Sequence, residues 1–303
     1  MSIRDTTPPS TAAGGVVAGV SVRSLFSLTG IDKSDVRVLL GYALGKTHAQ
    51  LVADAEYCLS ESEAERISNY LIRRTHGEPV SYVTGRRDFY SLTFRVTPSV
   101  LIPRPETELL VELALEYLSD HAQLLDMGTG SGVIAICVAH AKEDVAVTAT
   151  DISPEALRVA RKNAMYHQVA NRIVFRSGEW FSALAKGIRY DMIVSNPPYI
   201  ASDDPHLQQG DLRFEPACAL TDKKDGLSAF CALVDGAPAC LKEGGWLLME
   251  HGYDQADFVC ARLRARGFVS VRNWRDLAGI PRVSGGRWGN EDLCCFAGST
   301  IGK

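Results

Sequence analysis

The chain has 303 residues, of which 46% are hydrophobic and 22% are charged, and its formal net charge is −4. This length and composition exclude a disordered chain and indicate a soluble globular protein with more than one domain. The negative charge disfavours nucleic acid as the main partner, because domains that grip many phosphates are usually basic. No apolar run is long enough to span a membrane.

The 8 cysteines and 7 histidines are scattered along the chain. Ligands of a structural metal normally come in close pairs such as Cys-x-x-Cys. We therefore expect no bound metal. Because no secretory context is visible, we expect reduced thiols and a cytoplasmic location.

The first segment, residues 1–21, is rich in Ser, Thr, Pro, Ala and Gly. Such a composition buries little apolar surface and predicts a flexible tail. A signal peptide is not indicated, since that would need a basic start and a longer apolar stretch.

The next segment, residues 22–85, has a helical pattern. Apolar residues from Val36 to Leu44 recur at the spacing of one helix face. Ser60 and Glu63 match the capping box that opens a helix. We predict a small N-terminal domain built as a helical bundle.

Residues 86–102 consist of short β-prone runs around polar residues, which predicts a β-hairpin linker. The segment PRPETELLVELALEYL then begins a second domain, which we place at residues 103–303. Pro105 suits the first turn of a helix, and Glu106 suits the positive end of the helix dipole.

Strand-like and helix-like segments alternate from Gln123 onward, which predicts a Rossmann-like α/β domain with a parallel sheet flanked by helices. The seven predicted strands are QLLDMG, VAVTATD, RIVFRSG, DMIVSN, GGWLLMEHG, GFVSVRNW and DLCCFAG. Residues 279–289 (GIPRVSGGRWG) precede the last of these strands. We expect Arg282 and Arg287 in this stretch to touch a partner or the rim of a cofactor site.

A glycine-rich loop follows the first strand of this domain and opens a helix. It comprises Gly128, Thr129, Gly130, Ser131 and Gly132. Glycines let the backbone approach a ligand, and a helix N-terminus offers free N–H donors. The spacing is not that of the dinucleotide-binding fingerprint. The loop taken alone is a weak signal, and a tight strand-to-helix turn is the less favoured alternative.

Two further residues follow the next two strands. Asp151 is placed where an α/β sheet holds ribose hydroxyls, although it or Ser153 can also cap the following helix. Trp180 can wall an adenine site, or it can be a partly buried core tryptophan. Both alternatives stay open for each residue.

The fourth strand ends in VSNPPYI, where an apolar run stops at Asn196 and is followed by Pro197, Pro198 and Tyr199. Two prolines rule out a continuing central strand. Taken alone, the motif is equally consistent with a stiff turn. Because ligands bind beyond the carboxyl ends of parallel strands, we expect this turn, the glycine loop, Asp151 and Trp180 to share one crevice.

Asn-Pro-Pro-Tyr in this context resembles the class I S-adenosylmethionine-dependent methyltransferases that act on planar nitrogens. Four further stretches resemble the peptide-chain release-factor glutamine methyltransferases, namely GEPVSYVTG, LIPRPETELLVE, RFEPACAL and MEHGYDQ. The similarity runs from about Val36 to the C-terminus. It implies a seven-stranded methyltransferase sheet behind a helical domain that docks the protein substrate.

The resemblance implies site residues for both ligands. S-adenosylmethionine would contact the glycine loop from Gly128 to Gly132, Asp151, Trp180 and Asn196, and S-adenosylhomocysteine would be the product. The substrate glutamine would lie against Asn196, Pro197, Pro198 and Tyr199.

The implied reaction is methylation of the side-chain nitrogen, N5, of the glutamine in the Gly-Gly-Gln motif of a release factor. We assign catalytic roles to Asn196, Pro197 and Tyr199. The Asn196 side-chain carbonyl and the Pro197 backbone carbonyl can accept the two N–H groups of the amide, and Tyr199 can pack against its plane. No carboxylate is indicated as a general base, so we expect the proton to leave to water.

Three alternatives are weighed against this interpretation. One is a glutamine methyltransferase of a ribosomal protein, and another is an adenine-N6 methyltransferase, which the charge and the lack of a base-reading domain disfavour. The third is a binding module that has lost the reaction, which the intact motif disfavours. We expect a monomer with a release factor as partner and with no nucleic acid or membrane partner.

Overall fold

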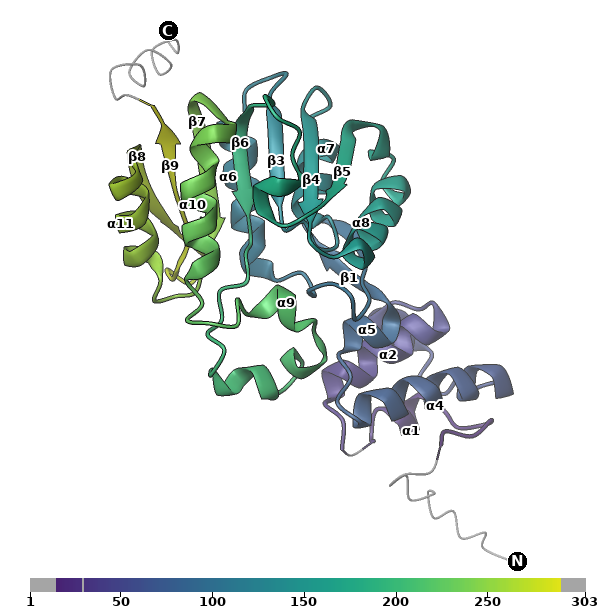
Figure 1. Ribbon diagram of the computed structural model, residues 1–303. Coiled ribbons are helices and arrows are strands. Elements are labelled where there is room, and N and C mark those ends of the chain that lie inside the picture. The colour runs from purple at the N-terminus through teal and green to yellow at the C-terminus, as the bar shows by residue number, and fades with distance from the viewer. Residues whose placement is uncertain (1–14, 29, 290–303) are drawn as a thin grey trace, which may run out of the picture. The chain divides into compact units, whose positions relative to one another are not determined.

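The computed structural model describes residues 15–28 and 30–289 (Figure 1). The chain divides into two compact units, Met1–Gly85 and Arg86–Lys303. The described residues contain no helix that is long and apolar enough to cross a bilayer.

The first unit is helical, as predicted. Its helices are α1 (Val22–Leu25), α2 (Lys33–Leu44), α3 (His48–Ala53), α4 (Glu61–Thr75) and α5 (Val80–Thr84). Their apolar faces form one core, which includes Val36, Leu39, Leu40, Leu51 and Ile67. The expected capping box is present, because Ser60 accepts from the Glu63 N–H while the Glu63 side chain accepts from the Ser60 N–H.

Part of the segment expected to be a tail contacts this unit. Leu59 makes two backbone hydrogen bonds to this segment, since its N–H donates to Val20 O at 3.0 Å and its carbonyl accepts from Gly19 N at 2.9 Å. Residues 1–14 lie outside the described residues.

The second unit begins with the predicted hairpin, formed by β1 (Arg86–Phe89) and β2 (Leu92–Arg95), which pair antiparallel. Tyr90 and Ser91 at its turn both have positive φ, at 49° and 60°. Two central residues with positive φ are what a two-residue hairpin turn requires.

A seven-stranded sheet follows, in the order β5-β4-β3-β6-β7-β9-β8. The strands are β3 (Gln123–Met127), β4 (Ala146–Asp151), β5 (Ile173–Ser177), β6 (Tyr190–Ser195), β7 (Leu241–Glu250), β8 (Phe268–Arg275) and β9 (Pro281–Trp288). The first five in the chain are parallel, and β9 is antiparallel to both of its neighbours. The α/β sheet predicted from the sequence is therefore confirmed, with an antiparallel edge.

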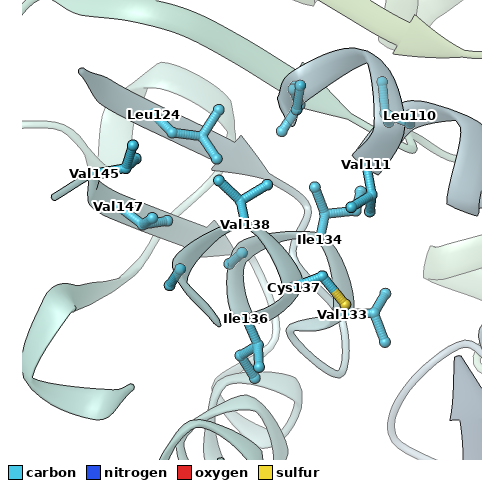
Figure 2. Packing of buried hydrophobic residues seen from close by; sticks show 14 of the residues in the cluster. Leu110, Val111, Leu124, Val133, Ile134, Ile136, Cys137, Val138, Val145 and Val147 are labelled. Carbon is cyan, nitrogen blue, oxygen red and sulfur yellow. The ribbon is translucent and has the colours of Figure 1, made fainter. Parts of the chain in front are cut away.

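Helices cover both faces of this sheet (Figure 1). One core cluster joins the sheet to α6 (Glu108–Tyr117), α7 (Val133–Ala141) and α8 (Pro154–Tyr166). The other joins it to α10 (Ser228–Cys240) and α11 (Ala256–Arg266). Figure 2 shows the first cluster, in which α7 is buried from Val133 to Ala139 because it packs against α6, α8 and the strands β3, β4 and β5.

Short helical elements lie in the connections between the longer helices and strands. They are η1 (Pro105–Thr107), η2 (Ala170–Arg172), η3 (Trp180–Ala183), η4 (Pro205–Gln208), η5 (Leu212–Phe214) and α9 (Ala217–Leu220).

Strand β9 corrects the sequence-based assignment, which placed residues 279–289 before the last strand. The stretch lacks the alternation of apolar and polar residues that predicts a strand, so it was not recognised as one. Its glycines are required by packing, since a Cβ on Gly285 would collide with the Leu247 carbonyl oxygen.

The two arginines of this stretch hydrogen-bond within the same unit. Arg287 Nε donates to Gly244 O at 2.9 Å, and Arg282 Nε donates to Asp276 Oδ2 at 3.1 Å. The strand predicted at DLCCFAG lies outside the described residues.

Candidate active site

A cleft of about 440 Å³ lies beyond the carboxyl ends of β3, β4 and β6. Most of the residues predicted from the sequence line it together, namely Gly128, Thr129, Gly130, Ser131, Asp151, Trp180, Asn196, Pro197 and Pro198. Gly132 follows the lining residue Ser131, and Tyr199 follows the lining residue Pro198, but neither lines the cleft itself. The expected convergence of the four motifs on one crevice is thus seen in the structure, and the ligand each motif holds stays a prediction.

The three glycines of the loop serve two purposes. All have positive φ, at 76°, 56° and 88° for Gly128, Gly130 and Gly132. A Cβ on Gly132 would lie 2.9 Å from Ile136 Cδ1 and 3.1 Å from Ala160 Cβ, so this glycine allows α7 and α8 to pack closely. A Cβ on Gly128 or Gly130 would meet no atom within 4 Å. These two positions leave room for a ligand at the loop.

Asp126, near the end of β3, connects the glycine loop to the first turn of α7 through hydrogen bonds. Its Oδ2 accepts from Thr129 Oγ1 at 2.6 Å and from the Ala135 N–H at 3.2 Å. Burial raises the pKa of Asp126 to about 7. Sequence reasoning did not single out this residue, although its place as the first residue of the DMGTGSG motif was a usable signal.

Asp151 links the loop to the start of α8. Its Oδ2 accepts from the Gly130 N–H at 2.9 Å, and its Oδ1 accepts from the Ser153 N–H at 2.8 Å. Ser153, and not Asp151, is the N-cap of α8. Each carboxylate oxygen has two acceptor lone pairs, so each can still accept a hydrogen bond from a ligand hydroxyl in the cleft.

Trp180 begins η3 with a φ of 44°. Its partly buried ring packs against the core cluster on the α10 side of the sheet, and it also lines the cleft. The two alternatives from the sequence, a core tryptophan and a cleft wall, are therefore compatible in this fold.

Asn196 makes a long-range hydrogen bond that sequence reasoning missed. Its Nδ2 donates to Thr107 Oγ1 at 3.1 Å. Among the described residues no donor to Asn196 Oδ1 is recorded, so this carbonyl oxygen is available at the cleft. Thr107 belongs to the PRPET segment and also lines the cleft.

Tyr199 points its hydroxyl to a buried acid. The hydroxyl donates to Glu250 Oε1 at 3.3 Å. Burial, together with the nearby Glu250 carboxylate, raises the pKa of Tyr199 well above its usual range. Burial also raises the pKa of Glu250 to about 7, against hydrogen bonds from Thr107 and Tyr199 that lower it.

The backbone of the Asn-Pro-Pro-Tyr turn is held from behind. Gln255 Nε2 donates to Tyr199 O at 2.9 Å, and the Ile200 N–H donates to Leu220 O at 3.0 Å. Gly226 packs so closely on this turn that a Cβ there would lie 3.0 Å from the Tyr199 carbonyl carbon and closer still to its oxygen. Asp222 fixes the loop that carries Gly226 by accepting from its N–H at 2.9 Å.

An ion pair whose carboxylate is buried borders the same cleft. Arg104 pairs with Glu215, whose other oxygen accepts from the Ile102 N–H at 2.9 Å. Burial raises the pKa of Glu215, and Arg104 opposes that shift. The pair ties the segment before η1 to the segment before α9, so that both line the cleft.

Two family descriptions match the sequence. Residues 105–212 match the Methyltransferase small domain, and residues 22–85 match the PrmC N-terminal domain. A solved methyltransferase from Pyrococcus furiosus has a similar fold, with a TM-score of 0.51 and 19% identity over 74% of this chain and 100% of the other. At this identity the structural likeness establishes the fold alone.

Curated relatives are similar over nearly their whole length. The release factor glutamine methyltransferase of Burkholderia pseudomallei is 45% identical over 289 residues, which is 93% of this chain and 99% of the relative. The protein of the same name from Neisseria gonorrhoeae is 46% identical over 262 residues, covering 86% of this chain and 95% of the relative. Identity at this level along both units shows that the chain belongs to the release factor glutamine methyltransferase family.

Proposed function

We propose that this protein transfers a methyl group from S-adenosylmethionine to N5 of the glutamine in the Gly-Gly-Gln motif of a peptide chain release factor. The observation that carries the proposal is Asn196 at the cleft, with its amide nitrogen bound to Thr107 and its carbonyl oxygen available. Family membership supports the same substrate. The proposed enzyme acts in the cytoplasm as a monomer, releases S-adenosylhomocysteine, and uses the helical domain at residues 22–85 to dock the release factor.

The cleft fits S-adenosylmethionine. Its volume of about 440 Å³ lies within the usual range for small-ligand sites. Open space at Gly128 and Gly130 admits a ligand next to the backbone, and Asp151 presents acceptors for ribose hydroxyls. The ring of Trp180 offers a flat apolar wall. When bound, S-adenosylmethionine supplies a methyl group already activated on a sulfonium.

The residues of the chain must position a weak nucleophile. An amide nitrogen is a poor nucleophile because its lone pair is delocalised into the carbonyl. In the proposed mechanism Asn196 Oδ1 and the Pro197 carbonyl accept the two N–H groups of the substrate amide. This arrangement orients the nitrogen and stabilises the positive charge that develops on it.

The two prolines and Tyr199 keep these acceptors in place. Proline fixes its own backbone angle, and Pro197 has no N–H that could compete for the acceptors. The Tyr199 hydroxyl is directed to Glu250 and not to the cleft, so contact between its ring and the substrate amide stays a prediction. Loss of the amide proton to water also stays a prediction.

Asp151→Asn is expected to weaken S-adenosylmethionine binding by about tenfold or more, since hydrogen bonds to charged groups are worth about 1.5–3 kcal/mol. Isothermal titration calorimetry measures the dissociation constant. Asp144→Asn is the matched control, because Asp144 lies before the opposite end of the same strand and accepts from the His121 N–H. Equal affinity of the two variants would show that Asp151 does not hold the ligand.

The proposed function is tested by incubating the purified protein with S-adenosylmethionine and a release factor. Peptide mass spectrometry is expected to find one added methyl group on the glutamine of the Gly-Gly-Gln motif. A release factor with asparagine in place of that glutamine is the control and is expected to gain nothing. Methyl transfer to a ribosomal protein or to adenine, with none to the release factor, would overturn the substrate assignment.

A further inference from the structure

We propose that Thr107 and Glu250 are positioning residues that orient the Asn196 side chain so that its carbonyl oxygen, and not its NH₂ group, meets the substrate amide. This inference rests on the proposed function, since it explains how the acceptor for the glutamine N–H is selected.

Three separate segments bring these residues together. Thr107 ends η1, Glu250 ends β7, and Asn196 follows β6. Thr107 and Glu250 are almost completely buried, with 2% and 1% exposure. Thr107 Oγ1 accepts from Asn196 Nδ2 at 3.1 Å, and the Tyr199 hydroxyl donates to Glu250 Oε1 at 3.3 Å. Thr107 lies close enough to Glu250 for its side chain to lower the pKa of that carboxyl.

The direction of each hydrogen bond follows from the chemistry of the groups. An ionised carboxylate can only accept, so Glu250 must receive the hydroxyl protons of Thr107 and Tyr199. With its proton directed to Glu250, the Thr107 oxygen turns its lone pairs to Asn196. The Asn196 NH₂ group is then the group that binds Thr107, and the carbonyl oxygen is left for the substrate.

A protonated Glu250 would remove this selection. It could donate to Thr107, whose own proton would then be free to point at Asn196. The Asn196 amide could then rotate by half a turn and present its NH₂ group to the substrate. Two donors, the Asn196 NH₂ and the substrate amide NH₂, would then face each other and could form no hydrogen bond. Selection of the acceptor therefore depends on the charge of Glu250.

The groups that surround Glu250 set that charge. Burial raises its pKa to about 7, and Glu106 of η1 acts in the same direction. Arg282 of β9 and the hydrogen bonds from Thr107 and Tyr199 lower the pKa of Glu250. Arg104 acts on the neighbouring Tyr199 hydroxyl. The second carboxylate oxygen of Glu250, Oε2, has no hydrogen-bond partner among the described residues. The Glu250 anion is therefore less stabilised than a fully bonded carboxylate.

The sign of the pH effect follows from this. Because the carboxylate is the selecting form, activity should be low below the pKa of Glu250 and rise as pH passes through about 7. Asp126 titrates in the same range, because burial raises its pKa to about 7 as well. A Glu250 variant is therefore needed to assign the pH effect.

The experiment compares kcat, KM and the pH profile of methylation of a release factor for Thr107→Val, Thr107→Ser and Glu250→Gln. Thr107→Val is expected to lower kcat by about 10- to 100-fold, as misplaced catalytic contacts do, with KM for S-adenosylmethionine nearly unchanged. Thr107→Ser is expected to restore most of the activity because it keeps the hydroxyl. Glu250→Gln is expected to lower kcat and to abolish the rise through about pH 7, which the free-enzyme profile reports.

Ser195→Ala is the matched control. Ser195 ends β6 next to Asn196, and its buried hydroxyl donates to Met127 O at 2.7 Å and not to the network. Its loss is expected to leave the pH profile as in the wild type. Full kcat in Thr107→Val, or an unchanged pH profile in Glu250→Gln, would overturn the inference. In either case methylation by the wild type would leave the proposed function standing, whereas its absence would overturn that function instead.

Discussion

Asn196→Ala is expected to lower kcat by at least about 100-fold, as for other lost positioning contacts in enzymes. In the proposed mechanism the Asn196 side-chain carbonyl accepts one substrate N–H, so the variant leaves only the Pro197 carbonyl to orient the amide. It also leaves Thr107 Oγ1 without its donor from Asn196 Nδ2. Single-turnover assays with labelled S-adenosylmethionine measure the chemical step directly.

The loss should fall on the transition state and much less on the ground state. We expect the dissociation constant for S-adenosylmethionine to change far less than kcat, since the glycine loop and Asp151 remain. Asn171→Ala, at an exposed asparagine of η2, is the matched control and should keep full activity. Turnover of Asn196→Ala near the wild-type rate would refute the proposed role of the side chain.

Gly226→Ala is expected to damage both stability and turnover. Gly226 has a φ of 79°, which costs an alanine about 1–2 kcal/mol. In addition, the new Cβ would press on the Tyr199 carbonyl, and forced overpacking costs about 1–3 kcal/mol. We expect the free energy of unfolding to fall by about 2–4 kcal/mol. We also expect kcat to fall because the Asn-Pro-Pro-Tyr turn must shift.

The matched control for this variant is Gly187→Ala. Gly187 has a similar φ of 85°, but a Cβ there would meet no atom within 4 Å. Chemical denaturation should show a loss of only about 1–2 kcal/mol for this control, and kcat should be unchanged. If both variants lost the same stability and both kept full turnover, contact with the turn would not be what requires glycine at 226.

The sequence predicts those parts of the fold whose signals are local. The helical unit, the hairpin and the parallel strands are all marked by apolar period or by capping residues such as Ser60 and Glu63. The convergence of the glycine loop, Asp151 and Asn196 also follows from sequence order, because the carboxyl ends of parallel strands share one edge.

Other parts depend on contacts between distant residues. Strand β9 has Pro, Arg, Ser and Gly where a strand usually has β-branched or aromatic residues, and it is a strand because it fits between β7 and β8. Thr107 and Asn196 lie 89 positions apart in the chain, so no spacing rule joins them. Glu250 lies in the predicted strand GGWLLMEHG, and no local signal in the sequence places its carboxyl beside Tyr199 and Thr107.

The position of β9 affects the order in which the site can be completed during synthesis. Strand β7 is left with one open edge until residues 281–288 have been made, because β9 inserts between β7 and the earlier-made β8. Glu250 pairs with Val283 in that strand, and Arg282 is one of the charges acting on its carboxylate. A chain still emerging from the ribosome can thus form the glycine loop and the Asn-Pro-Pro-Tyr turn before Glu250 has its final surroundings. Non-local strand pairing of this kind forms late in folding, so the methylation centre matures only when almost the whole described chain has been translated.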